Sequence, residues 1–221
     1  MRNLIIIPLV ILLCAGPLRA ARLHGKVSLQ QAEAKAPLSA YSRGVYVPGA
    51  LDKKPAEGNP EGKEPKVIVW AEPVGAAPKF VQPAEKPRMI QQNKEFIPSV
   101  LAVQTGTTIG FPNLDPLYHN VFSYSKAKRF DLGRYQQGKS KDITFDQPGV
   151  VEVYCEIHEN MHAYIMVIDT PYFTKTGKNG EFTLELPGGK YKVYAWIPNS
   201  KSEPAEVELS ATGDTEVNFA F

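Results

Sequence analysis

Short segments that alternate apolar and polar residues, each closed by a turn-forming residue, restrict the fold of this chain more than any other feature. Seven of them follow one another between Met89 and Asp169, and each has four to seven residues: MIQQ, SVLAVQ, TTIGF, HNVFSY, DITF, VVEVYC and AYIMVID. Gly, Pro, Asn or Asp bounds each segment, as is typical of antiparallel sandwiches. With 19 prolines and 17 glycines in the chain, helices are disfavoured. The sequence therefore predicts an all-β fold.

Similar segments lie on both sides of this series. Turns at KNG (178–180) and PGG (187–189) predict tight hairpins in the later group, because glycine adopts positive φ readily. The intervening stretch 48–65 is rich in proline and charge, and we expect a flexible loop there. The stretch 30–41 favours at most one helical turn, interrupted by Pro37. The flanking strand-like segments are HGKVSL (24–29), KVIVWAE (66–72), EFTLEL (181–186), KYKVYAWI (190–197), AEVEL (205–209) and TEVNFAF (215–221).

The first 20 residues have the pattern of a signal peptide. Arg2 precedes an apolar run over 4–13, about half of the roughly 20 residues that span a bilayer, and small residues lead to Ala20. We therefore expect export, to the periplasm or beyond, and no integral membrane segment after cleavage. Without Arg2 and Arg19 the chain has 23 basic and 23 acidic residues, a balance that gives no reason to expect nucleic-acid binding.

The stretch CEIHENMH (155–162) contains two overlapping metal motifs. Read as H-E-x-x-H, it is the zinc-protease signature, which works only on a helix because both histidines must share one face. Here about seven residues separate two predicted strands, so the context opposes a helix. Read as C-x-x-H-x-x-M, it offers thiolate, imidazole and thioether donors, the set that suits copper. His119, at the start of HNVFSY, supplies the second imidazole that an electron-transfer copper site requires.

Residues 88–170 resemble the cupredoxin (type 1, or blue, copper) family, in its plastocyanin, pseudoazurin and amicyanin branch. The resemblance lies in FIPSVLAVQTGTTIGFPN, in HNVF after a proline-containing loop, and in GVVEVYCEIHENM. It implies a Greek-key β-sandwich with His119, Cys155 and His158 as equatorial copper ligands and Met161 as the axial ligand. It also implies that Asn120 joins the two ligand loops by hydrogen bonds.

The remaining histidines and cysteines limit this site to one copper ion. Cys155 is the only cysteine outside the leader, so a binuclear site that needs a second cysteine is excluded. Multicopper enzymes need further histidines, and only His24 and His162 remain. His162 has no counterpart in the implied ligand set, and we expect a surface residue or a neighbour that tunes the site. The expected site is therefore mononuclear and not enzymatic.

The segment TKTGKNGEFTLELPGGKYKVYAWIP (174–198) resembles a second family, the carboxypeptidase regulatory-like β-sandwich of transthyretin-like architecture. The implied organisation is an insertion. In it, residues 21–86 and 171–221 form a smaller immunoglobulin-like or transthyretin-like sandwich, and residues 87–170 form the cupredoxin domain within it. The alternative is that the strands before residue 87 extend the copper domain.

The function expected from these resemblances is one-electron transfer by an exported blue copper protein, with a redox partner such as a c-type cytochrome. Two alternatives remain open: a protein that handles copper without redox cycling, and an envelope interaction module with a vestigial metal site. The stretch 123–141 carries six basic residues and is either a surface that steers an acidic partner or a solvated loop. Pro116 and Leu117 are expected in the docking patch, and electrons are expected to pass through His158.

Overall fold

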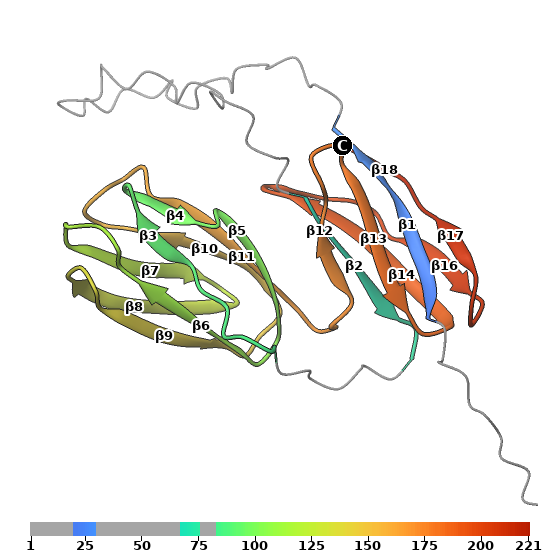
Figure 1. Cartoon of the computed structure of the whole chain (residues 1–221), viewed down its shortest axis with the longest axis horizontal. Helices are drawn as coiled ribbons and strands as arrows, with labels where there is room; N and C mark the ends of the chain where they lie inside the picture. The colour runs from blue at the N-terminus through green and yellow to red at the C-terminus, as the bar shows by residue number, and fades with distance from the viewer. Residues whose placement is uncertain (1–19, 30–66, 76–82) are drawn as a thin grey trace, which may run out of the picture.

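Two β-sandwiches make up the part of the chain that the structure describes. The structure is a computed structural model that describes residues 20–29, 67–75 and 83–221. Within these ranges it consists of strands and connections without a helix, which confirms the predicted all-β fold. No helix in the described ranges is therefore long and apolar enough to cross a membrane. Figure 1 shows the two sandwiches next to each other.

We call the unit formed by the middle of the chain the central sandwich. Its strands are β3 (Ile90–Gln92), β4 (Glu95–Ile97), β5 (Val100–Gln104), β6 (Thr107–Pro112), β7 (His119–Ser125), β8 (Lys128–Tyr135), β9 (Ser140–Phe145), β10 (Gly149–Tyr154) and β11 (His162–Ile168). Five of them form a sheet in the order β5-β11-β10-β7-β8, and β6-β9 and β3-β4 form two smaller sheets. The pair β5-β11 is parallel, while the other neighbours in the large sheet are antiparallel.

We call the second unit the outer sandwich. Strands from both ends of the described chain build it: β1 (Ala21–Ser28), β2 (Ile68–Pro73), β12 (Phe173–Lys175), β13 (Glu181–Leu186), β14 (Gly189–Ile197), β15 (Ser200–Lys201), β16 (Ala205–Leu209), β17 (Asp214–Glu216) and β18 (Phe219–Ala220). One sheet has the order β13-β1-β17, with β18 also paired to β1. The other has the order β12-β2-β14-β15, with β16 also paired to β14. The strands that precede the central sandwich thus pair with the strands that follow it.

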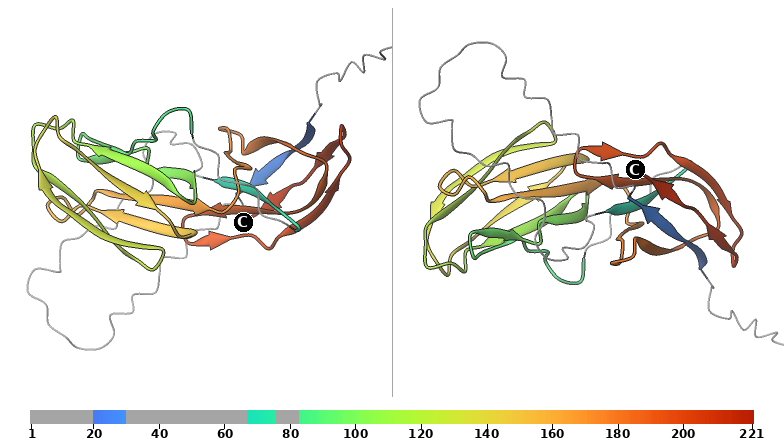
Figure 2. Two further views of the ribbon diagram at one scale, coloured as in Figure 1. Left: turned by 90° about the horizontal axis from the view of Figure 1, so that it is seen from below. Right: turned by 90° about the horizontal axis from the view of Figure 1, so that it is seen from above.

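The sheets lie in successive layers (Figure 2), and successive side chains of a strand face the layers on opposite sides of it. On β11, Ala163, Ile165 and Val167 face the core of the central sandwich, whereas Met166 and Ile168 face the outer sandwich. On β14 the same alternation sends Val193 and its odd-numbered neighbours into the outer core and Trp196 into the contact between the sandwiches. The sequence of β11, HAYIMVI, has a long apolar run, which suits a strand that is covered on both faces.

Most of the predicted strands are present, and the main error concerns the basic stretch 123–141. It is not a loop across the end of the sandwich, because residues 128–135 form strand β8, which pairs with β7. The short strands β4, β12 and β15 were not predicted, and TEVNFAF is divided into β17 and β18. The expected leader, apart from Ala20, the helical turn at 30–41 and the loop at 48–65 lie outside the described residues.

Candidate metal centre

Three side chains from two distant parts of the central sandwich converge at one of its ends. His119 is the first residue of β7, Cys155 follows β10, and His158 lies in the loop between β10 and β11. One donor atom from each lies within 4.8 Å of the others. His119 Nδ1 lies 3.0 Å from His158 Nδ1 and 3.8 Å from Cys155 Sγ. His119 and Cys155 are buried, while His158 is partly exposed, so the cluster is reached from solvent through His158.

The loop from Cys155 to Met161 is closed by its own backbone. The N–H of Cys155 donates to the carbonyl of Met161 at 3.3 Å, and the N–H of Met161 donates to the carbonyl of His158 at 3.0 Å. These bonds hold a tight connection between two antiparallel strands, and this described segment is not helical. Met161 is 1% exposed and belongs to the same apolar cluster as Cys155. The loop therefore lacks the helical backbone that H-E-x-x-H zinc chemistry requires.

His162 lies apart from this cluster. It begins β11 opposite Tyr154, and the rings of these two residues stack with centroids 4.5 Å apart. Tyr164 contacts the imidazole as well, at 4.6 Å between centroids, and His162 Nε2 lies 3.3 Å from a carboxylate oxygen of Glu152. His162 therefore lies on the face of the sheet that is turned away from the core of the central sandwich, the same face as Met166, and aromatic and charged neighbours hold it there.

Asn120 connects the two segments that carry the cluster. Its Oδ1 accepts a 2.7 Å hydrogen bond from the backbone N–H of Glu156, the residue after Cys155. Asn120 is 2% exposed and Glu156 is exposed, so the bond joins a buried acceptor to a loop residue at the surface. The bond fixes the start of β7 against the loop after β10.

Asp115 is a part of the site that the sequence reasoning missed. Its carboxylate lies 2.8 Å from His119 Nε2, with side-chain exposures of 8% for Asp115 and 0% for His119. A carboxylate accepts the proton of Nε2, which leaves the lone pair of Nδ1 directed at Cys155 and His158. The signal in the sequence was an aspartate four residues before His119, in the proline-containing loop DPLYH.

The electrostatics of the cluster agree with these contacts. Burial acts to raise the pKa of Asp115, but hydrogen bonds from the Lys94 backbone, from His119 and from the Asn93 backbone outweigh it. The pKa of Asp115 therefore lies below its ordinary value. Burial lowers the pKa of His158, and the neighbouring His119 and Lys94 lower it further. The shift favours neutral His158, the form in which an imidazole binds a metal.

The donor atoms fit a soft or borderline metal ion. Two imidazole nitrogens and one thiol sulfur, all within 4.8 Å, are close enough to contact a single ion. Without an ion, the two Nδ1 atoms at 3.0 Å would have to share a proton in a hydrogen bond. The Asp115 contact favours the tautomer of His119 without a proton on Nδ1, and the lowered pKa of His158 favours its neutral form, so each ring can offer a nitrogen lone pair to a metal. Imidazole and thiolate donors suit copper and zinc, and both fit this donor set.

Comparison with known proteins gives partial structural likenesses. No family model matches the chain, and no curated protein sequence matches it. A copper-containing nitrite reductase from Thermus scotoductus SA-01 is similar over 43% of this chain and 25% of its own, with 26% identity and a TM-score of 0.37. A purple cupredoxin from Nitrosopumilus maritimus is similar over 37% of this chain and 98% of its own, with 22% identity and a TM-score of 0.34.

A reduced, singly substituted amicyanin is similar over 38% of this chain and 84% of its own, with 18% identity and a TM-score of 0.36. The chain thus spans a quarter of the nitrite reductase and most of the two smaller proteins. Each of the three likenesses covers less than half of this chain. The case for a metal at this site therefore rests on the geometry of His119, Cys155 and His158.

Proposed function

We propose that this chain is an exported blue copper protein that carries one electron at a time. His119, Cys155 and His158 are the equatorial ligands of one copper ion in this proposal, and Met161 is the axial ligand. The observation that carries the proposal is the convergence of two imidazole nitrogens and one thiol sulfur within 4.8 Å at one end of a β-sandwich. Trigonal His₂Cys coordination with a weak axial methionine is the geometry of electron-transfer copper.

Bound copper would supply the redox couple, since thiolate and thioether favour Cu(I) while imidazole suits both oxidation states. The role of the protein is to keep the ligands in one place. His119 is fixed by Asp115, the Cys155 loop is fixed by Asn120, and the loop end is closed by backbone bonds at Met161. A site that barely moves exchanges electrons with little reorganisation. The four proposed ligands leave no position for a substrate, which favours electron transfer over catalysis.

The proposed docking surface for a redox partner, such as a c-type cytochrome, surrounds His158. Pro116 and Leu117 lie in the loop before His119, and Leu117 is 41% exposed. Large exposed apolar side chains mark interaction sites when they gather on one surface. In this proposal the partner contacts these residues, and the electron passes through the partly exposed His158. The other large exposed apolar residues beside the ligands in sequence are Leu114, Tyr118 and Ile157.

The visible spectrum of the Cu(II)-loaded protein tests this proposal. A thiolate ligand to Cu(II) gives an intense visible band, and Cys155→Ser is expected to abolish it without unfolding either sandwich. A colourless protein that binds only Cu(I) would favour copper handling without redox cycling. Failure to bind copper in either oxidation state would favour an interaction module with a vestigial site. Unchanged copper affinity in Cys155→Ser would refute the ligand assignment.

The leader and the outer sandwich complete the proposal. Export through the leader at 1–20 would place the protein in the periplasm or outside the cell, where a c-type cytochrome is available as a partner. The limits 21–86 with 171–221 for the outer sandwich, and 87–170 for the copper domain, remain predictions, as does the transthyretin-like identity of the outer sandwich. Release of a shortened mature chain, detected by mass spectrometry of the exported protein, would support the leader.

A further inference from the structure

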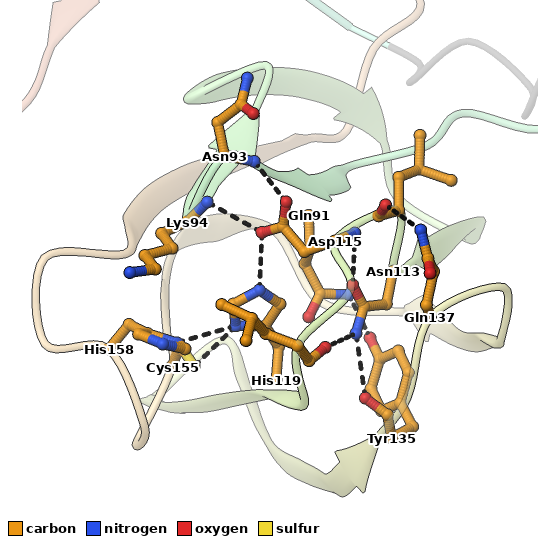
Figure 3. A network of polar contacts seen from close by, with 12 residues as sticks. Gln91, Asn93, Lys94, Asn113, Asp115, His119, Tyr135, Gln137, Cys155 and His158 are labelled. Carbon is orange, nitrogen blue, oxygen red and sulfur yellow. Dashed lines mark hydrogen bonds and ion pairs between the residues drawn. The ribbon is translucent and has the colours of Figure 1, made fainter.

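The carboxylate of Asp115 is the polar partner of the distal nitrogen of His119. Its oxygen lies 2.8 Å from Nε2, and both side chains are almost completely buried. Figure 3 shows the Asp115 carboxylate above the His119 ring, next to the ring nitrogen that does not face Cys155 and His158. A hydrogen bond to an ionised group in a dry environment is short and strong compared with a neutral one. The electronic state of this imidazole therefore depends on Asp115.

The carboxylate itself is held from three directions. Besides the contact with His119, the backbone N–H groups of Asn93 and Lys94 donate to its two oxygens at 2.6 and 2.8 Å. Both residues have positive φ, 56° and 57°, and form the two-residue turn between β3 and β4. This turn geometry aims two consecutive N–H groups at one acceptor. Asp115 is thus oriented before any metal binds.

Asn113 fixes the backbone on which Asp115 stands. Its Oδ1 accepts the N–H of Asp115 at 2.9 Å, and its Nδ2 donates to the carbonyls of Leu117 and Tyr135 at 2.8 and 3.0 Å. Asn113 is completely buried. The loop between β6 and β7 is therefore tied to β8 as well as to the β3-β4 turn, as Figure 3 shows. Asp115 is thus held through its backbone as well as through both oxygens of its carboxylate.

We propose that Asp115 is a positioning residue that fixes the tautomer and ring orientation of His119 and lowers the reduction potential of the copper centre. The inference rests on the proposed function, because it presupposes copper at this cluster. A carboxylate that accepts the Nε2 proton increases the electron density of the imidazole. A more basic ligand and a nearby negative charge both stabilise Cu(II) more than Cu(I).

The variant Asp115→Asn tests this inference, because it keeps the shape of the side chain and removes the charge. We expect the blue band to persist, Cu(II) affinity to fall by about 10- to 100-fold, and Cu(I) affinity to fall less. Each tenfold preferential loss of Cu(II) affinity corresponds to a rise of about 59 mV in potential for a one-electron couple. The matched control is Asp146→Asn, which removes a 64% exposed aspartate paired with Lys128. The control is expected to keep the wild-type potential.

The outcomes separate the two proposals. A wild-type protein without a blue band refutes the proposed function, whatever the variants do. A blue Asp115→Asn protein with the wild-type potential refutes the role of Asp115 and leaves the proposed function intact. Asp115→Glu, which restores the charge, is expected to return the potential towards the wild-type value.

A measurement on the unaltered protein covers the case in which Asp115→Asn does not fold. Nuclear magnetic resonance of the reduced, Cu(I) protein is expected to show His119 protonated at Nε2, with a slowly exchanging, strongly deshielded proton that reports the carboxylate contact. A rapidly exchanging Nε2 proton at an ordinary chemical shift would overturn the inference.

Discussion

His158 and His162 are separated by four positions in the sequence, and the structure gives them different surroundings. His158 Nδ1 lies 3.0 Å from His119 Nδ1, whereas His162 stacks on Tyr154 at 4.5 Å on the face of the sheet that is turned away from the core of the central sandwich. The copper proposal needs only the first of them, and zinc-protease chemistry needs both. The two histidines therefore provide a direct comparison at the scale of single residues.

Alanine at each of these positions is the first prediction. His158→Ala is expected to abolish the blue band, because it removes an equatorial donor. His162→Ala is expected to keep the band and to bind copper within about threefold of wild type, since the large effects on affinity come from ligands and from residues that contact them. Titration with Cu(II), followed by visible absorption, distinguishes the two variants. If both variants lost the band equally, the assignment of His158, and not His162, as a copper ligand would be wrong.

Asn120 gives a second prediction, about stability. Asn120→Ala removes the 2.7 Å bond that the buried Asn120 side chain accepts from the backbone N–H of Glu156, a part-buried hydrogen bond. The expected loss is about 0.5 to 1.5 kcal/mol of unfolding free energy, the net contribution of a typical intramolecular hydrogen bond. Asn218 accepts a similar bond from Lys26 at an exposed site, so Asn218→Ala is the matched control. Chemical denaturation of the copper-free proteins measures both, and equal losses would contradict the role of burial.

The outward positions of β10 support a third prediction, at the scale of one strand. Tyr154 donates to Glu152, two residues earlier on the same face, and this bond, with burial, raises the pKa of Tyr154 to about 12. The unfolded tyrosine titrates near pH ~10, so the stabilising contribution is complete below that pH and is lost as pH rises towards the folded pKa. Absorbance titration of tyrosinate should show Glu152→Gln lowering this pKa. An unchanged titration curve in Glu152→Gln would contradict the contact.

Most strands of the central sandwich were predicted from the sequence, but β8 was not. Alternation and turn residues predicted the strands from β5 to β7 and from β9 to β11 because each buries one face or both. Strand β8 was read as loop because its sequence KRFDLGRY is charged and only partly buried, and its partner β7 decides its conformation. Such pairing is non-local, and no local pattern encodes it.

The sequence likewise predicted some residues of the candidate site and not others. The motif in the β10-β11 loop and His119 at the start of β7 were found from the sequence, because the sequence gives the type of each donor residue and the spacing between them. Asp115 was not found, because its role depends on a turn 21 or 22 residues earlier and on contacts made only in the folded sandwich. Residues that orient a metal-binding histidine through its other ring nitrogen are brought to it by tertiary structure.

The two sandwiches pack against each other through a cluster of apolar side chains. Trp70 of β2 and Trp196 of β14 are both 4% exposed there, and they are the two tryptophans of the chain. Tyr164 of β11 packs edge-on against Trp196, with ring centroids 5.7 Å apart. Apolar burial of this kind couples the stability of one unit to that of the other. Tryptophan emission therefore reports the interface, while the blue band reports the metal centre.

The fourth prediction follows from this coupling. Trp196→Ala is expected to cost about 3 to 5 kcal/mol, the typical loss for a large aromatic residue in a core, without changing the colour of the copper form. In the wild type, tryptophan emission and the blue band should be lost at the same temperature. The control Tyr124→Ala alters an aromatic residue that is 71% exposed and should leave the melting temperature within a few degrees of wild type. Separate transitions in the wild type would contradict the coupling.

Reversible redox titration of the copper-loaded protein, followed at the blue band, tests the central claim of one-electron transfer most directly. We expect one electron equivalent per protein to bleach the band completely and reoxidation to restore it over repeated cycles. We also expect Cys155→Ser to show no such band. A protein that binds copper but releases it on reduction, or whose band does not return on reoxidation, would contradict the account.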